Sequence, residues 1–130
     1  MEDVAVRFEG VAPQFVVEDV VRTAEYYRDV FGFEITGYFL DPPVHAIVRR
    51  GRCEVFLGKA VGGVGVSNKS VKPEAIDAYF RISGLDSFAS ETAKRGARIL
   101  EGPVARVYQM RELVVEDCNG FVLVFGEDLS

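Results

Sequence analysis

Cysteine and histidine are scarce in this 130-residue sequence, and their scarcity excludes several classes of site. The two cysteines, Cys53 and Cys118, lie 65 positions apart, with no further cysteine or histidine at metal-ligand spacing. Neither a disulfide framework nor a structural zinc site is therefore indicated. His45 is the single histidine, which also argues against a site built from several imidazole ligands.

Long hydrophobic runs are missing as well. No run approaches the ~20 apolar residues that a membrane-spanning helix needs. The clearest apolar run, at 121–125, has the length of a strand. Near the first residue, Glu2 and Asp3 stand where a secretory signal would carry lysine or arginine, and no apolar segment follows them. We therefore expect a cytoplasmic protein that does not associate with membranes.

Basic residues are not in excess. Fifteen lysines and arginines face twenty acidic residues, which gives a net charge of −5, and no basic cluster stands out. Nucleic acid is therefore a poor candidate partner. The sequence also lacks a Ser-His-Asp arrangement, a phosphate-binding loop and a dinucleotide fingerprint, which disfavours covalent and nucleotide chemistry. With 48% hydrophobic and 27% charged residues, the composition is that of one ordinary globular domain at 1–130.

The first half of the chain carries the pattern of a strand, a helix and three strands. Residues 11–17 form an apolar run of strand type, and Asp19 then stands where a helix N-cap is expected. The helix should end at Gly32, because glycine readily adopts the left-handed conformation. Its apolar face is formed by Val20, Val21, Ala24, Tyr27, Val30 and Phe31. Strand-length segments follow at 33–40, 44–50 and 53–59.

The second half repeats this order of signals. A strand is predicted at 77–82, and Ser83 and Asp86 then resemble a capping box that begins a helix. Gly96 should end that helix. Further strands are predicted at 98–100, 110–115 and 121–126. A turn containing Asn-Gly joins the last two of these strands.

The repetition predicts two similar modules in one chain. Phe15 and Phe80 are offset by 65 positions, and the two helix-ending glycines by 64. The first module covers about 11–60 and the second about 76–128. The residues between them, 61–75, are rich in Gly, Ser, Lys and Pro and are predicted to be a linker. Residues 1–10 form either an edge strand or a flexible arm.

Two segments give this pattern a family resemblance. One runs from Asp19 to Phe33 with the sequence DVVRTAEYYRDVFGF, and the other from Met110 to Gly126 with the sequence MRELVVEDCNGFVLVFG. Together with the tandem modules, they resemble the vicinal oxygen chelate superfamily, which groups glyoxalase I, extradiol dioxygenases and bleomycin-resistance proteins. The resemblance implies an α+β fold in which two tandem βαβββ modules form a curled mixed sheet around a shared, open cavity. It also implies a homodimer, with the cavity at or near the interface.

The resemblance further locates the positions at which metal-dependent members bind their metal through four ligands. The corresponding positions are Ala12, Asp77 and Val124, together with either Glu54 or Phe56. Ala12 and Val124 offer no metal donor, so at most two carboxylates remain. A catalytic metal usually needs three or more protein ligands. We therefore expect no metal and no cofactor.

Neighbouring residues on the same strand faces are candidates for binding a ligand, because side chains alternate along a strand. Gln14 shares the face of Ala12, where its amide either fixes a polar group of a ligand or bonds to water at the rim. Glu54 and Phe56 share a face and combine a carboxylate with a large apolar surface. Glu54 either recognises a cationic ligand or only reaches solvent.

The remaining candidates also allow two interpretations each. Tyr79 and Arg81 share the face of Asp77, where they either bind a ligand or Arg81 and Asp77 form a structural ion pair. His45 is either a ligand-contacting base or a half-buried strand residue. Glu112 and its neighbour at 111 point to opposite faces, so only one of them can face the cavity.

These observations predict a binding protein without catalytic residues, which sequesters a small, partly aromatic molecule such as an antibiotic. The candidate ligand-binding residues are Gln14, His45, Glu54, Phe56, Asp77, Tyr79, Arg81 and Glu112. The alternative is a metal-dependent lyase, isomerase or dioxygenase of the same superfamily with a divergent ligand set. That set would draw on His45, Glu54, Asp77 and Glu112.

Overall fold

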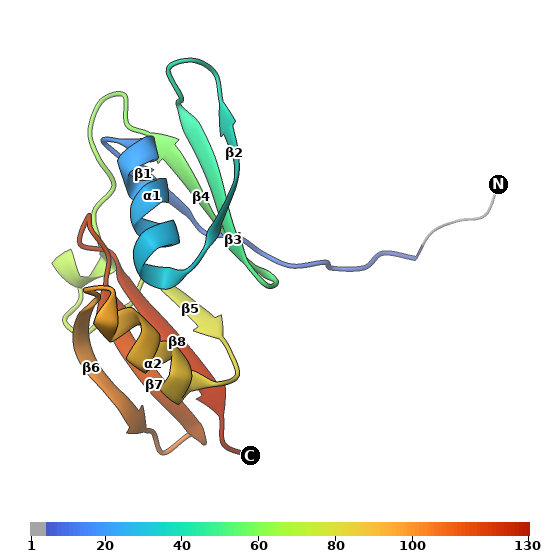
Figure 1. The fold of residues 1–130 in the computed structure, drawn as a ribbon, viewed down its shortest axis with the longest axis vertical. Coiled ribbons are helices and arrows are strands. Elements are labelled where there is room, and N and C mark those ends of the chain that lie inside the picture. Colours follow the sequence, from blue (N-terminus) through green and yellow to red (C-terminus); the bar gives the residue numbers. More distant parts are fainter. Residues whose placement is uncertain (1–4) are drawn as a thin grey trace.

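The computed structural model describes residues 5–130, and residues 1–4 lie outside the described part. Two modules follow each other along the chain and lie one above the other in Figure 1, each with one helix packed against a four-stranded sheet. The predicted fold class is confirmed, because the chain is an α+β protein made of two tandem βαβββ modules.

The first module contains β1 (Gln14–Val17), α1 (Val20–Phe31), β2 (Glu34–Phe39), β3 (His45–Arg50) and β4 (Cys53–Lys59). Its strands are ordered β1-β4-β3-β2, with β1 parallel to β4 and the other pairs antiparallel. The predicted limits of the helix are confirmed. The Asp19 carboxylate accepts a hydrogen bond from the backbone N–H of Arg22, and Gly32 ends the helix in the left-handed conformation with φ 73°.

The second module contains β5 (Ala78–Arg81), α2 (Leu85–Lys94), β6 (Arg98–Ala105), β7 (Met110–Glu116) and β8 (Val122–Asp128). Its strands are ordered β5-β8-β7-β6, the same topology as in the first module. One short 3₁₀ turn, η1 (Asn68–Ser70), lies in the linker between the modules.

Two local predictions were wrong. Ser83 does not cap α2: the N-cap is Gly84, and the Glu127 carboxylate of β8 accepts from its backbone N–H. A carboxylate 43 residues away in the sequence thus replaces the predicted local cap. Strand β6 continues past the predicted end at Leu100 to Ala105, and two irregularities in its pairing with β7 accommodate Gly102 and Pro103.

The expected single sheet curled around a shared cavity is also not what one chain forms. The two four-stranded sheets are separate and not closed. Each helix covers one face of its own sheet and packs against alternate side chains of the central strands. These buried side chains include Ala46, Val48, Val55 and Leu57 under α1, and Leu113, Val115, Leu123 and Phe125 under α2. On the helix-free side of the second sheet, Glu112, Val122 and Val124 are buried as well. We call the opposite, helix-free side of each sheet its open face.

Aromatic side chains join the two modules. The rings of Phe15 in β1 and Phe121 before β8 stack with their centroids 4.3 Å apart. Phe33, just after α1, contacts Phe80 of β5 edge to face at 6.0 Å. These residues are at most 5% exposed, so the joint is a continuation of the hydrophobic core.

A buried hydrogen bond reinforces this joint. The Tyr27 hydroxyl of α1 donates to the Asp117 carboxylate in the β7–β8 turn at 2.6 Å, and neither residue is more than 1% exposed. The same carboxylate accepts from the backbone N–H groups of Asn119 and Phe121. Burial raises the pKa of Asp117, although these three hydrogen bonds lower it in part. The turn of one module is thereby fixed to the helix of the other.

Residues 5–13 form an extended arm without strand pairing, in which Val6, Phe8 and Val11 are exposed. The arm leads away from the first module in Figure 1. Of the two predicted alternatives for 1–10, the described residues 5–10 match the arm, and residues 1–4 lie outside the described part. Within residues 5–130, neither helix is long and apolar enough to cross a bilayer.

The contact between Tyr27 and Asp117 predicts a specific loss of stability. Tyr27→Phe leaves a buried carboxylate oxygen without its donor, which should lower the free energy of unfolding by about 1–3 kcal/mol. Urea unfolding followed by circular dichroism measures this change. Tyr26→Phe is the matched control, because it removes the same atom from a half-buried neighbouring ring, and it should change the stability by about 0.5 kcal/mol or less. Equal stability of both variants would contradict the role given to the hydrogen bond.

Candidate functional site

A broad cavity of about 910 Å³ lies on the open face of the second sheet. Val114 of β7 and Val122 and Val124 of β8 line it with apolar side chains. Leu100 of β6 and Ile76, just before β5, extend this apolar lining. The cavity therefore offers a hydrophobic surface on a rigid sheet, as small-molecule sites usually do.

A polar cluster centred on Glu112 lines the same cavity. Its Oε2 accepts hydrogen bonds from the hydroxyls of Tyr79 at 2.7 Å and Tyr108 at 2.8 Å. Its Oε1 accepts from Nε of Arg106 at 2.9 Å, and Arg106 also forms an ion pair with Glu101 at 2.6 Å. The Glu112 side chain is only 4% exposed, so its charge is held by three donors away from water.

These contacts set the protonation states of the cluster. Burial raises the pKa of Glu112, but the hydrogen bonds from Tyr79, Tyr108 and Arg106 outweigh it and lower the pKa below its usual value. Burial, and then the hydrogen bond to Glu112, raise the pKa of Tyr79 well above that of a free phenol. At neutral pH the carboxylate is therefore charged and the phenol neutral, and neither is poised for proton transfer.

Tyr79 reaches Glu112 by lying across a glycine. Tyr79 belongs to β5 and Glu112 to β7, and Gly126 of β8 lies between them. A Cβ atom at position 126 would collide with the Tyr79 phenol. The first sheet repeats this arrangement in a looser form, because a Cβ at Gly58 would lie 3.2 Å from Nε2 of Gln14.

The open face of the first sheet carries four of the predicted residues. His45 lies between two aromatic rings, with its centroid 5.5 Å from that of Phe39 and 5.7 Å from that of Phe56. Glu54 and Phe56 alternate with buried residues of β4 and share the open face, as their spacing predicts. Gln14 is exposed on the same face. None of these residues lines the cavity on the second sheet.

Asp77 and Arg81 do not line the cavity on the second sheet, unlike Tyr79. The Asp77 carboxylate accepts hydrogen bonds from the Ser67 hydroxyl at 2.6 Å and from the backbone N–H groups of Asn68 and Val122 at 2.8 Å each. It therefore fastens the linker to the start of β8 and does not line the cavity. Arg81 does not pair with it and stands at the edge of a different cleft, between the two modules.

Strand register shows which of Glu54 and Phe56 occupies the fourth of the metal-ligand positions. Gln14 of β1 lies beside Phe56 of β4, and Tyr79 of β5 lies beside Val124 of β8. These are corresponding places in the two modules. The counterpart of Val124 is therefore Phe56, and Glu54 lies two residues before it.

Glu112, and not its neighbour, faces the cavity. Arg111 forms an ion pair with Asp86 of α2 on the helix-covered side. Sequence reasoning missed Arg106 and Tyr108, which lie in the turn between β6 and β7. Their types and their position beside a predicted strand were visible in the sequence. The turn conformation that folds them back onto Glu112 was not.

The residues at the four metal positions do not fit a divalent cation. Val124, Phe56 and Ala12 provide no donor atom, and the Asp77 carboxylate already accepts three hydrogen bonds. Within residues 5–130, no group of three or more His, Cys, Asp or Glu side chains is placed to hold a metal ion. The divergent set is also divided between the two modules, with His45 and Glu54 in the first and Asp77 and Glu112 in the second.

Comparison with known proteins identifies the fold. No family model and no curated protein matches the chain. The structure of TioX from Micromonospora sp. ML1 is similar with a TM-score of 0.72, 18% identity and coverage of 91% of this chain and 97% of that one. TnmS3, described as an antibiotic binding protein from Streptomyces sp. CB03234, is similar with a TM-score of 0.70, 14% identity and coverage of 98% and 99%.

A glyoxalase/bleomycin resistance protein/dioxygenase from Nocardioides is similar as well, with a TM-score of 0.69, 13% identity and coverage of 98% of this chain and 87% of that one. These structures match nearly the whole chain, so the resemblance seen in the sequence is confirmed at the level of the fold. The chain has the glyoxalase/bleomycin-resistance type of fold.

The crossing of Tyr79 over Gly126 predicts different effects for two equivalent substitutions. Gly126→Ala places a methyl group where the phenol lies, so Tyr79 must move and Glu112 loses a donor. The free energy of unfolding should fall by about 1.5–3 kcal/mol, the range for hydrogen bonds to charged groups. Thermal and urea unfolding measure this loss.

Gly58→Ala is the matched control in the first sheet. The flexible amide of Gln14 can move aside there, so the stability should change by about 0.5 kcal/mol or less. A Gly126→Ala variant as stable as the Gly58→Ala variant would mean that the phenol is not held across the strand.

Proposed function

We propose that this chain of glyoxalase/bleomycin-resistance fold binds a small, partly aromatic molecule, such as an antibiotic, and sequesters it without changing it chemically. The observation that carries the proposal is the cavity on the second sheet, in which apolar strand residues and a polar cluster around Glu112 share one volume of about 910 Å³. Such a combination suits a ligand with a flat apolar body and a few polar groups.

The cluster specifies which polar groups of a ligand it would recognise. The hydroxyls of Tyr79 and Tyr108 both donate to Glu112, so their oxygen lone pairs are left to accept hydrogen bonds. A ligand with N–H or O–H donors beside an aromatic ring therefore fits best, with the ring over Val114 and Val124. The net charge of −5 adds a mild preference for cationic over anionic ligands.

The lack of a suitable donor set for a metal favours binding over catalysis. Metal-dependent lyase, isomerase or dioxygenase chemistry needs a cation with open coordination positions. The residues at the corresponding positions do not supply its ligands, and near neutral pH Glu112 stays charged and Tyr79 stays protonated, because the pKa of Glu112 is lowered and that of Tyr79 is raised. The fold that the chain shares with TnmS3, described as an antibiotic binding protein, agrees with this proposal.

We propose that a second copy of the chain completes the site. The open face of the first sheet carries two half-buried rings, His45 and Phe56. Phe39 and Gln14 lie exposed beside them. If a partner places this face over the cavity of the second sheet, both sets of predicted residues contact one ligand. A symmetric dimer forms two such sites and covers both open faces. The exposed arm at 5–13 adds apolar contact area.

Isothermal titration calorimetry against a panel of cationic and aromatic antibiotics tests the binding proposal. At least one member should bind more tightly than millimolar. Val114→Arg places a long charged side chain on the apolar lining and should weaken that binding about tenfold or more. The control Val61→Arg, at a fully exposed linker position, should bind like the parent. If no member of the panel binds, or if Val114→Arg binds as the parent does, the proposed function is wrong.

Sedimentation velocity tests the proposed assembly. At micromolar concentrations, the chain should sediment with about twice its monomer mass of 14.4 kDa, because two open sheet faces are costly to leave in water. A single monomeric species over that concentration range would contradict the shared site.

A further inference from the structure

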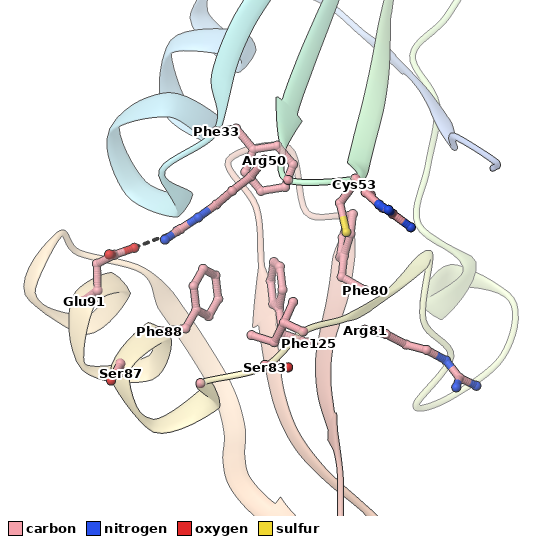
Figure 2. Close-up of a pocket in the computed structure, with 14 residues that line it drawn as sticks. Phe33, Arg50, Cys53, Phe80, Arg81, Ser83, Ser87, Phe88, Glu91 and Phe125 are labelled. Carbon is pink, nitrogen blue, oxygen red and sulfur yellow. Dashed lines mark hydrogen bonds and ion pairs between the residues drawn. The ribbon is translucent and has the colours of Figure 1, made fainter. Parts of the chain in front are cut away.

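A second, separate cleft lies where the two modules meet. Its volume is about 540 Å³. One wall comes from the end of β3, the turn at 51–52 and the start of β4, and the other comes from β5 and α2 (Figure 2). None of its lining residues lines the cavity on the open face. The two spaces are separate because successive residues of β5 and β8 point to opposite sides: Tyr79 and Val124 to the cavity, Phe80 and Phe125 to the cleft.

The floor of this cleft is aromatic. The rings of Phe80 and Phe125 stack at 4.9 Å and 15°, and Phe88 of α2 lies 4.5 Å from Phe125. Phe33 closes the floor from the first module, 6.0 Å from Phe80. All four are at most 7% exposed, so the hydrophobic core holds them in place and the floor is already formed without a ligand. Such a floor suits a flat apolar ring.

The rim of the cleft is positive, in contrast to the chain as a whole. Arg50, Arg52 and Arg81 line it, against a single carboxylate, Glu91. Arg50 is already committed, because its guanidinium pairs with Glu91 at 2.7 Å (Figure 2) and also donates to the backbone carbonyl of Phe31. Arg52 and Arg81 form no ion pair within residues 5–130. Arg81 points to the side of β5 opposite Phe80, where its charge acts on Asp128, so Arg52 is the rim arginine best placed to meet an external anion.

Two serines and a cysteine complete the lining. Ser83 and Ser87 come from the start of α2 and add hydroxyl donors to the rim. In Figure 2 the sulfur of Cys53 points from β4 towards the aromatic floor, and Arg81 reaches outward from the lip. An acid group at the mouth would lie on the rim that carries Arg52, while the attached ring would lie inside.

From this arrangement we propose that the cleft between the modules is a second ligand site, which binds a small planar aromatic anion such as an arene carboxylate. The ring rests on the four phenylalanines and the acid group pairs with Arg52 at the positive rim. This site is independent of the open-face site and opposite to it in charge preference, because it has an excess of arginine where the open-face cavity holds a buried carboxylate.

A pair of naphthalene probes tests the charge requirement. Naphthalene-2-carboxylate carries the acid, and naphthalene-2-carboxamide has nearly the same shape without the charge. The sequence contains no tryptophan, so titration can follow naphthalene fluorescence without tryptophan emission. The carboxylate should bind saturably. The R52Q/R81Q variant should bind the carboxylate about tenfold more weakly than the parent does, and the carboxamide less than about twofold more weakly.

Two further variants separate this site from the open-face site. Phe88→Leu keeps the packing under α2 apolar but removes one aromatic ring from the floor of the cleft. It should lower the affinity for both probes. Val114→Arg, which disrupts the open-face cavity, should leave both probes unaffected. Loss of probe binding in Val114→Arg would place the probe on the open face and overturn the proposal. Unchanged affinity in R52Q/R81Q, or no saturable binding up to about 1 mM carboxylate, would overturn it too.

Alkylation of Cys53 gives an independent readout. In a Cys118→Ser background, Cys53 is the single thiol, and burial raises its pKa, so the reaction with iodoacetamide is followed at alkaline pH. Saturating naphthalene-2-carboxylate should slow this reaction about tenfold, since the ring covers the sulfur. An unchanged rate at saturation would show that the probe lies elsewhere.

Discussion

One constraint governs this structure: each four-stranded sheet has a single helix, so a helix covers only one face of each sheet. Side-chain alternation then divides every central strand into a core face and an open face. The core face supplies the stability of the module. The open face is left to bind something else, whether a ligand or a second copy of the chain.

The same alternation explains how one short chain can carry two kinds of binding surface. Between the modules, the core residues Phe80 and Phe125 reach the edge of the core and form the floor of the cleft. On the other side of the same strands, Val124 and Tyr79 face the open cavity. A buried, fully hydrogen-bonded Glu112 organises that cavity, so its polar groups are fixed by neighbouring side chains and need no metal for their positions.

Sequence reasoning located the residues whose placement depends on local spacing. Period-two alternation correctly put Glu54 and Phe56 on one face, and helix periodicity correctly buried Tyr27. It failed where placement depends on distant contacts. The carboxylate of Asp77 accepts hydrogen bonds from the linker. Ser83 does not cap α2, because the first backbone N–H groups of that helix donate to the Glu127 carboxylate.

Arg106 and Tyr108 were missed for the same reason. Their approach to Glu112 depends on a turn and on two strand irregularities in β6 that no residue spacing reveals. Residue spacing also could not predict that the two sheets of one chain stay separate. The order of strands and helices is the same whether a module's sheet joins the other sheet of its own chain or a sheet of a second chain. The sequence pattern thus predicts the faces of the strands, but not which faces meet.

We propose that one ligand site is shared between the first sheet of one copy and the second sheet of its partner. Mixing two variants, Phe56→Arg on the first sheet and Val114→Arg on the second, tests it by calorimetry with the tightest-binding antibiotic. Each variant alone should fail to bind. In an equilibrated 1:1 mixture, half of the dimers combine both variants and regain one of two sites, so about a quarter of the parent's capacity should return. A mixture with no binding, or full binding by Phe56→Arg alone, would contradict the claim.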